Sequence, residues 1–254
     1  MSEPVTYWRV YKGASFDLWN PDTDLYYGSV AADEIATHLY EKRQRSHKNE
    51  RSPFSEFSET WIDDPDTLPC RRPRIAFRDI TNRTNTRTVI AALVPGEVVI
   101  TNQAPYLLWP EGNQRDEAFL LGVLSSMILD WYARCVVELH VNFHILNNFP
   151  IPDADIDRDP IARRVVQIAG RLAAVDQQYV EWADAVGVPV GSVTNDATKL
   201  DLICELDACV AHLYGLDEDD LAVVYETFHK GTDHSERHRE VLAHFRRVTA
   251  DKAG

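Results

Sequence analysis

The sequence has no stretch of about 18 uncharged apolar residues, so it predicts no transmembrane helix. Its first residues, MSEPVTYWRVYKG, lack the apolar segment of a secretory signal. Four cysteines in 254 residues are too few for a disulfide scaffold. We therefore expect a cytoplasmic protein with no membrane association.

The motifs of common enzyme classes are also missing. The chain has only 11 glycines and contains no P-loop and no G-x-G-x-x-G, so it offers no phosphate or cofactor cradle. It has no G-x-S-x-G, no H-E-x-x-H and no C-x-x-C. No catalytic residue, cofactor-binding residue or metal ligand is predicted from motifs.

Three groups of residues have a spacing that metal ligands could have, and each has an ordinary structural alternative. A zinc site needs at least three suitable ligands, whereas each histidine pair supplies two, and the cysteine group lies near the buried face of a helix. Packed or solvated side chains are favoured for all three. The groups are His140 with His144, His234 with His238, and Cys204 with Cys209 and His212.

Charge is the clearest compositional feature. The content of 44% hydrophobic and 26% charged residues is typical of a globular chain, and the net charge is −14. The negative net charge argues against nucleic-acid binding, but two segments of the chain carry an excess of positive charge. Residues 42–51 carry five basic side chains against Glu50, and residues 71–90 carry six arginines against Asp79. Because salt screens charges beyond about 8 Å, such cationic islands can attract phosphate in an acidic protein.

Hydrophobic patterning predicts an α+β fold in two parts. In the first part we expect a strand at 5–12, a helix from 31 to 47 and an irregular connector over 48–70. Short strands at 74–80, 87–94 and 97–102, with a possible fourth at 105–109, predict a compact antiparallel or mixed sheet. A wide apolar stripe over 114–134 predicts a buried helix.

The second part is predicted to be a bundle of helices. Apolar residues recur every three or four positions over 161–185 and 196–214. A third helix begins after Asp217, a suitable N-cap, and a fourth covers 234–248. We place the domain boundary near residue 155, with a recognition-type α+β domain over 1–155 and a helical spacer or docking domain over 156–254.

The segment RRPRIAFRDITNRTNTRT (71–88) concentrates groups that suit nucleic-acid contact. Arginine binds phosphate and guanine edges, and asparagine can pair with an adenine edge. A solvated hairpin with surface arginines explains the same pattern, and the pattern alone does not separate the two. Phe54, Phe57 and Trp61 could stack on bases, but packing onto the sheet is the favoured interpretation.

Three longer motifs resemble the target-recognition region of large N6-adenine DNA methyltransferases of type IIG-like restriction–modification and phage-defence systems. The strand pair R-I-A-x-R … N-T-R-T is matched by Arg74, Ile75, Ala76, Arg78, Asn85, Thr86, Arg87 and Thr88. The helix L-L-G-x-L-x-S-x-x-x-D-W is matched by Leu120, Leu121, Gly122, Leu124, Ser126, Asp130 and Trp131. The exit, an N-F-x-I segment followed by P-x-P, is matched by Asn142, Phe143, Ile145, Pro150 and Pro152. The segments VYKGASFDLWNPD and LDACVAHLYGLDEDDLAVVYETF extend the resemblance over nearly the whole chain.

The resemblance covers the recognition region only. Such methyltransferases hold the flipped adenine in an Asn/Asp-Pro-Pro-aromatic loop and bind S-adenosylmethionine at a Gly-containing motif, and this sequence has neither. The resemblance therefore implies a recognition module without its catalytic half, whether fragment, split subunit or decayed gene. S-adenosylmethionine is expected only on the missing catalytic domain or on a partner, and we expect no catalysis by this chain alone.

We accordingly expect a DNA target-recognition module that binds double-stranded DNA and a methyltransferase catalytic subunit or domain. The residues assigned to DNA contact are Arg71, Arg74, Arg78, Arg83, Thr84, Asn85, Arg87, Thr88, Asn142 and His144. The alternative is a protein-interaction or regulatory subunit that docks on a methylase through its helical half. In that case the arginine segment is ordinary surface.

Overall fold

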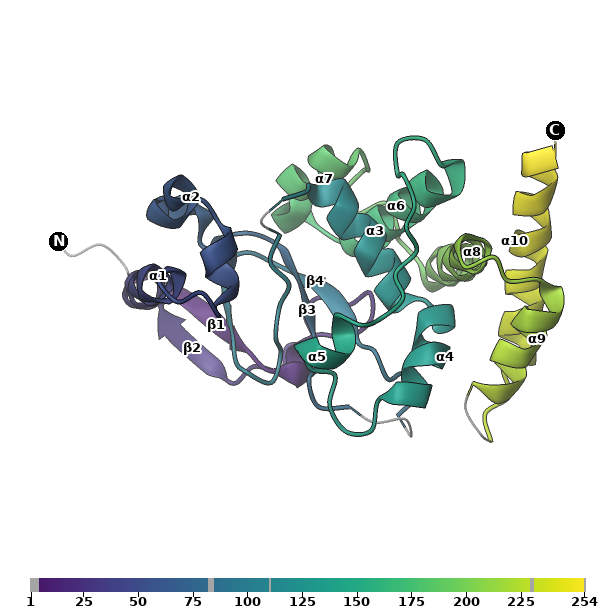
Figure 1. Ribbon diagram of the computed structural model, residues 1–254, viewed down its shortest axis with the longest axis horizontal. Coiled ribbons are helices and arrows are strands. Elements are labelled where there is room, and N and C mark those ends of the chain that lie inside the picture. Colours follow the sequence, from purple (N-terminus) through teal and green to yellow (C-terminus); the bar gives the residue numbers. More distant parts are fainter. Residues whose placement is uncertain (1–4, 82–84, 110, 229–230, 254) are drawn as a thin grey trace. The chain divides into compact units, whose positions relative to one another are not determined.

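The computed structural model describes residues 5–81, 85–109, 111–228 and 231–253. Chain contacts divide it into two compact units: unit 1 comprises Met1–Asp79 and Ala92–Gly112, and unit 2 comprises Ile80–Ala91 and Asn113–Gly254. Unit 1 carries a small sheet and unit 2 is mostly helical, so the α+β prediction is confirmed (Figure 1). This division differs from the expected boundary near residue 155. The reason is that the helices after Asn113 pack with the later helices.

Unit 1 is built around strand β1 (Tyr7–Tyr11), the centre of a three-stranded sheet. β1 pairs antiparallel with β2 (Gly28–Ala31) and parallel with β5 (Val98–Ile100). Strands β3 (Arg74–Phe77) and β4 (Ala91–Val94) form a separate two-stranded sheet. Sequence patterning missed β2 and predicted one sheet where there are two.

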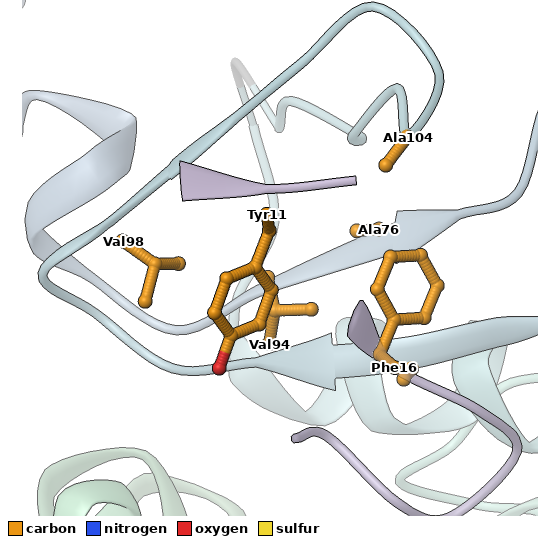
Figure 2. Close-up of a cluster of buried hydrophobic side chains, with 7 residues drawn as sticks. Tyr11, Phe16, Ala76, Val94, Val98 and Ala104 are labelled. Carbon is orange, nitrogen blue, oxygen red and sulfur yellow. The ribbon is translucent and has the colours of Figure 1, made fainter. Parts of the chain in front are cut away.

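Both faces of β1 are covered by apolar side chains. Successive side chains of a strand point to opposite faces, so Trp8 and Tyr11 lie on different sides. Trp8 packs in a cluster with Ala32 and Ala36 of helix α1 (Ala32–His47). Tyr11 packs with Phe16, Ala76 and others, which Figure 2 shows gathered around the strand. The chain between α1 and β3 forms the short helix α2 (Glu59–Asp63) and 3-10 turns, including η2 (Pro53–Glu56).

Unit 2 begins with a helix pair that replaces the single helix predicted over 114–134. α3 (Gln114–Ser125) and α4 (Met127–Val136) meet at a bend of 64°. Ser126 causes the break: its extended backbone ends α3, and its hydroxyl accepts from Leu129 N–H to cap α4. In the described part of the chain no single helix is long and apolar enough to span a membrane, although this bent pair passes the same test when its halves are joined.

Most of the remaining helices form a bundle. The helices after α4 are α5 (Phe143–Leu146), α6 (Pro160–Ala173), α7 (Val180–Val186), α8 (Asp196–Leu213), α9 (Glu218–Thr227) and α10 (Ser235–Ala253). α6 packs between α3 and α8, and α10 packs on α8. The helix predicted over 161–185 divides into α6 and α7, while the N-cap predicted at Asp217 is confirmed by a capping box with Asp220.

Helices α3 and α6 approach each other closely at one position. A Cβ placed on Gly122 of α3 would lie 2.8 Å from Val165 Cγ1 of α6 and 3.2 Å from Ala169 Cβ. Only a residue without a side chain fits this contact. The helix of residues 114–125 is therefore held by the helical bundle, which is why it belongs to unit 2.

Candidate nucleic-acid interface

The chain leading into β4 is tied to helix α4 through Arg87. Arg87 Nε donates to Asp130 Oδ2 at 2.9 Å. Its Nη2 donates to the carbonyl oxygens of Ser125 and Ser126 at 2.8 and 2.9 Å, at the bend between α3 and α4. Both of these nitrogens are satisfied by the protein's own oxygens. Arg87 therefore links two of the three motifs described above, the N-T-R-T segment and the helix that contains Asp130.

Asp130 is completely buried and accepts backbone hydrogen bonds in addition to this ion pair. Its Oδ1 accepts from the backbone N–H groups of Thr88 at 2.9 Å and Val89 at 2.7 Å. Burying a carboxylate is costly unless it is paired and hydrogen-bonded, and both conditions are met here. Thr88 is likewise fully buried. The contacts around Asp130 therefore lie in the protein interior, where they stabilise the fold.

Arg134, one helical turn after Asp130, holds the preceding part of the same segment. Its Nη2 donates to the carbonyl oxygens of Asn85 and Thr86, both at 2.7 Å. The guanidinium lies 4.3 Å from the ring centroid of Phe228, and burial lowers its pKa. The backbone of residues 85–88 is thus fixed to α4 by charged side chains.

Arg74 and Arg78 are also used inside the protein, in unit 1. Arg74 is only 5% exposed, and its Nη2 donates to the Val98 carbonyl at 2.9 Å. Arg78 Nη2 donates to the Phe16 carbonyl and lies 3.5 Å from Asp17 Oδ2. With Arg87 and Thr88, these side chains serve the fold, and we retain none of them as a DNA contact.

Of the other residues predicted to contact DNA, some are exposed and two are not among the residues that the structure describes. Arg71, Asn85, Asn142 and His144 are exposed. Asn142 caps α5 by accepting from Ile145 N–H, and Asn85 Nδ2 lies 3.4 Å from Thr81 Oγ1. Arg83 and Thr84 lie outside the described residues.

The structure brings part of the arginine segment beside the 140–148 segment. Ile80 and His140 form an antiparallel bridge, and Thr81 N–H donates to the Leu139 carbonyl at 3.0 Å. Residues 71–79 belong to unit 1, whereas residues 80–88 belong to unit 2. The arginine-rich segment 71–88, predicted to contact DNA as one stretch, is therefore divided between the two units.

The cationic island over 42–51 has a different character. Lys42, Lys48 and Arg51 are exposed, and none forms an ion pair with a described residue. Arg45 pairs loosely with Glu41, at 3.7 Å. The buried Arg43 donates to Thr67 Oγ1 and the Asp64 carbonyl. Its guanidinium also lies 4.9 Å from the Trp61 ring centroid.

The connector aromatics stack on one another. Phe57 and Trp61 have ring centroids 4.1 Å apart, and those of Phe54 and Trp61 are 6.5 Å apart. The segments that carry them pack against α1. This cluster lies within unit 1, and Phe54 and Trp61 remain partly exposed.

Most of the histidines and cysteines with ligand spacing pack against other side chains, whereas His140 and His144 are exposed. His212 stacks on Phe245 at 3.8 Å and His238 on Tyr225 at 5.3 Å. Cys204 and Cys209 are buried, which raises their thiol pKa values to about 11 and about 12. No three His, Cys, Asp or Glu side chains are grouped to hold a metal ion within the ranges described.

Two important residues were not singled out for these roles from the sequence. Asp130 was read only as part of a helix motif, although a lone acid inside an apolar stripe is a signal for a buried partner. Arg43 was counted as a surface cation, but it is 1% exposed.

No protein-family model, curated protein or solved structure matches this chain.

Proposed function

We propose that this chain is a DNA target-recognition module, non-catalytic by itself, that works with an adenine-specific methyltransferase domain or subunit. The resemblance of its three motifs supports this function. The observation that carries it is a group of exposed cations on unit 1 that form no ion pair with any described residue. They are Lys42, Lys48, Arg51, Arg71 and Arg72.

Unpaired exposed cations suit phosphate contact for a physical reason. An arginine already bonded to carboxylates or carbonyls must give up those bonds before it binds phosphate, whereas a solvated lysine gives up only water and counterions. Release of counterions from DNA drives such binding and makes it salt-dependent. The exposed side chains of residues 42–51 and 71–72 therefore replace Arg74, Arg78 and Arg87 as the proposed contacts.

Unit 2 suits a different partner. Residues 80–91 and 113–254 carry 15 basic and 24 acidic side chains. A net negative surface repels phosphate, so we assign DNA contact to unit 1 and protein contact to unit 2. The methyltransferase partner would supply S-adenosylmethionine binding and the reaction itself.

The test is duplex binding measured by fluorescence anisotropy at increasing salt. The wild-type chain should show a negative log–log slope, and Lys48→Gln with Arg51→Gln should reduce that slope by roughly 0.9 for each phosphate that is no longer neutralised. Arg158→Gln with Arg163→Gln, which removes two exposed cations of unit 2, is the matched control and should leave the slope unchanged. Absence of duplex binding, or equal slopes in all variants, would reject the proposal.

A second candidate is a regulatory subunit that docks through unit 2. It is favoured by an apolar cavity of about 220 Å³ lined by Ile128, Trp131, Tyr132 and Val223, among others. Two of its apolar lining residues, Val223 and Tyr132, are 50% and 37% exposed. If the chain binds no duplex but binds a methylase encoded in a neighbouring frame, and Val223→Asp abolishes that binding, this candidate replaces the first.

A further inference from the structure

Unit 1 contains a cavity that only one of the proposed phosphate contacts, Lys42, lines. It has a volume of about 180 Å³, opens to solvent, and lies between the C-terminal half of α1, the turn η2 and strand β5. This volume is far larger than a single water needs. The side chains that decide its chemistry are Lys42, Arg43, Phe54, Arg74 and Tyr106.

The charge of this cavity is opposite to that of the unit around it. Unit 1 has 11 basic and 16 acidic residues, yet the cavity lining includes three cations and no carboxylate. Arg43 is 1% exposed, and its Nε has no hydrogen-bond partner among the described atoms. The guanidinium also forms no ion pair with a described carboxylate, and a buried charge without a partner is costly, so a nearby anion stabilises it. The cavity therefore favours an anion.

The remaining walls are apolar and partly aromatic. Phe54 and Tyr106 are each half-buried and line the cavity with Leu39, Val99 and Ile100. Such walls match a planar aromatic group better than a hydrated inorganic ion, because apolar surface is removed from water on contact. One ligand that combines a planar aromatic group with an adjoining anion is a nucleotide.

We propose that this cavity takes the base and adjoining phosphate of one unpaired nucleotide in bound DNA. The inference rests on the proposed function, because it identifies which part of the DNA unit 1 would hold. Lys42, at the exposed edge of the cavity, binds the phosphate, while Arg43 keeps its bonds to Thr67 and Asp64 and contributes positive charge to the cavity wall. Phe54 and Tyr106 contact the base.

A nucleotide bound in this cavity should change the affinity for DNA by a measurable factor. A base inside a duplex must leave the stack before it can enter a cavity, and the cost is smallest where it is already unpaired. Contact between a base and aromatic side chains is worth roughly 1–3 kcal/mol, which corresponds to about 5-fold to 150-fold in affinity. We therefore expect about tenfold tighter binding of a duplex with one unpaired nucleotide than of the same duplex fully paired.

The experiment compares these two duplexes with the full chain and two matched variants. Lys42→Gln removes the cavity lysine, and Lys48→Gln removes an exposed lysine of the same helix end that does not line the cavity. Both variants remove one charge, so nonspecific attraction changes equally. A further variant, Phe54→Leu, removes the ring but keeps an apolar side chain. Thermal melting checks that each variant folds.

The predicted result is a preference for the unpaired nucleotide that disappears in Lys42→Gln and Phe54→Leu and is kept in Lys48→Gln. Duplex binding without that preference, or with equal effects of the two lysine variants, would overturn the inference and leave the proposed function standing.

Titration with 2′-deoxyadenosine 5′-monophosphate and with inorganic phosphate separates the sources of the ligand. Free nucleotide binding that depends on Lys42, in a chain that binds no duplex, would overturn the DNA-recognition function and support a free-nucleotide cavity instead. Binding of phosphate as tightly as the nucleotide would overturn the role of the aromatic walls.

Discussion

Arg87 and Asp130, 43 residues apart, form an ion pair in which the carboxylate is fully buried and the guanidinium nearly so. The same carboxylate accepts from the backbone at Thr88 and Val89, so one side chain fixes both the direction and the position of the chain entering β4. The N-T-R-T motif and the D-W helix are parts of a single structural unit. Their arginine is therefore a poor choice for a DNA contact and a good choice for a stability test.

Arg87→Ala should lower the free energy of unfolding by about 3–5 kcal/mol, because it leaves the Asp130 carboxylate buried without its cation. Arg71→Ala, which removes an exposed arginine of the same segment, should change it by less than about 0.5 kcal/mol. Urea unfolding followed by circular dichroism measures both. Equal stability of the two variants would contradict the assignment.

Adding Asp130→Asn to Arg87→Ala provides the double-mutant test of the same pair. With the carboxylate neutralised, the destabilisation caused by Arg87→Ala should shrink, and the coupling free energy should fall within about 0.5–3 kcal/mol. Additive effects would mean that the 2.9 Å contact contributes no stability of its own.

The lowered pKa of Asp22 predicts that the stability of unit 1 depends on pH. Burial alone raises its pKa, but hydrogen bonds from Tyr26, Asp24 N–H and Tyr11, together with Arg9, outweigh burial and lower it. A lowered folded-state pKa means that Asp22 stabilises the fold above its unfolded pKa of about 3.9 and loses this contribution as the pH falls through the folded value. Asp22→Asn should therefore cost about 1–3 kcal/mol at pH 7.

The difference between wild type and Asp22→Asn should narrow steadily below about pH 4. Asp66→Asn, at an exposed position with no ion pair among the described residues, is the control and should follow the wild type at every pH. Unfolding curves from pH 3 to pH 8 supply the measurement, and a difference that widens in acid would show the sign to be wrong.

The cysteines should differ sharply in reactivity. Cys135 is exposed, whereas Cys70, Cys204 and Cys209 are buried and burial raises the pKa of each of these thiols. Because the thiolate is the reactive form, only Cys135 should react rapidly with a disulfide reagent in the native protein near pH 7.5. All four should react in denaturant. Disappearance of the rapid phase in Cys135→Ser identifies the site, and rapid native reaction of two thiols would disagree with the packing.

Gly122→Ala should destabilise unit 2. The new Cβ would lie 2.8 Å from Val165 Cγ1, so α3 and α6 must separate, at a cost of about 1–3 kcal/mol. Gly28→Ala is the matched control, because a Cβ there meets nothing within 4 Å. Thermal melting compares the two. A Gly122→Ala chain that melts like the control would show that the helix contact is looser than described.

The sequence alone determined most of the helices and several strands, because their signals are local. Apolar spacing every three or four residues predicted α6, α8 and a helical segment over 114–134, and Asp217 marked the start of α9. The strand around Trp8 followed from its aromatic and β-branched residues. Periodicity did not reveal the bend at Ser126, because the apolar stripe continues through it.

Pairing between distant segments was decided by the tertiary structure. β2 lies in a turn-rich segment with little strand signal and forms because β1 offers it a free edge. The parallel pairing of β1 with β5 joins residues about 90 positions apart, and no local pattern encodes such a partner. The division into units likewise depends on close contacts such as the one at Gly122.

The partner of each arginine side chain was the feature that the sequence predicted least well. A guanidinium has the same chemistry whether it meets a phosphate, a carboxylate or a carbonyl, so the pattern over 71–88 was equally consistent with surface and interior positions. Asp130, the Val98 carbonyl and the Phe16 carbonyl became partners only because folding brought them close. The sequence determined where the cations are along the chain, and tertiary packing determined which of them remain free for a ligand, because only packing decides which charges are removed from water.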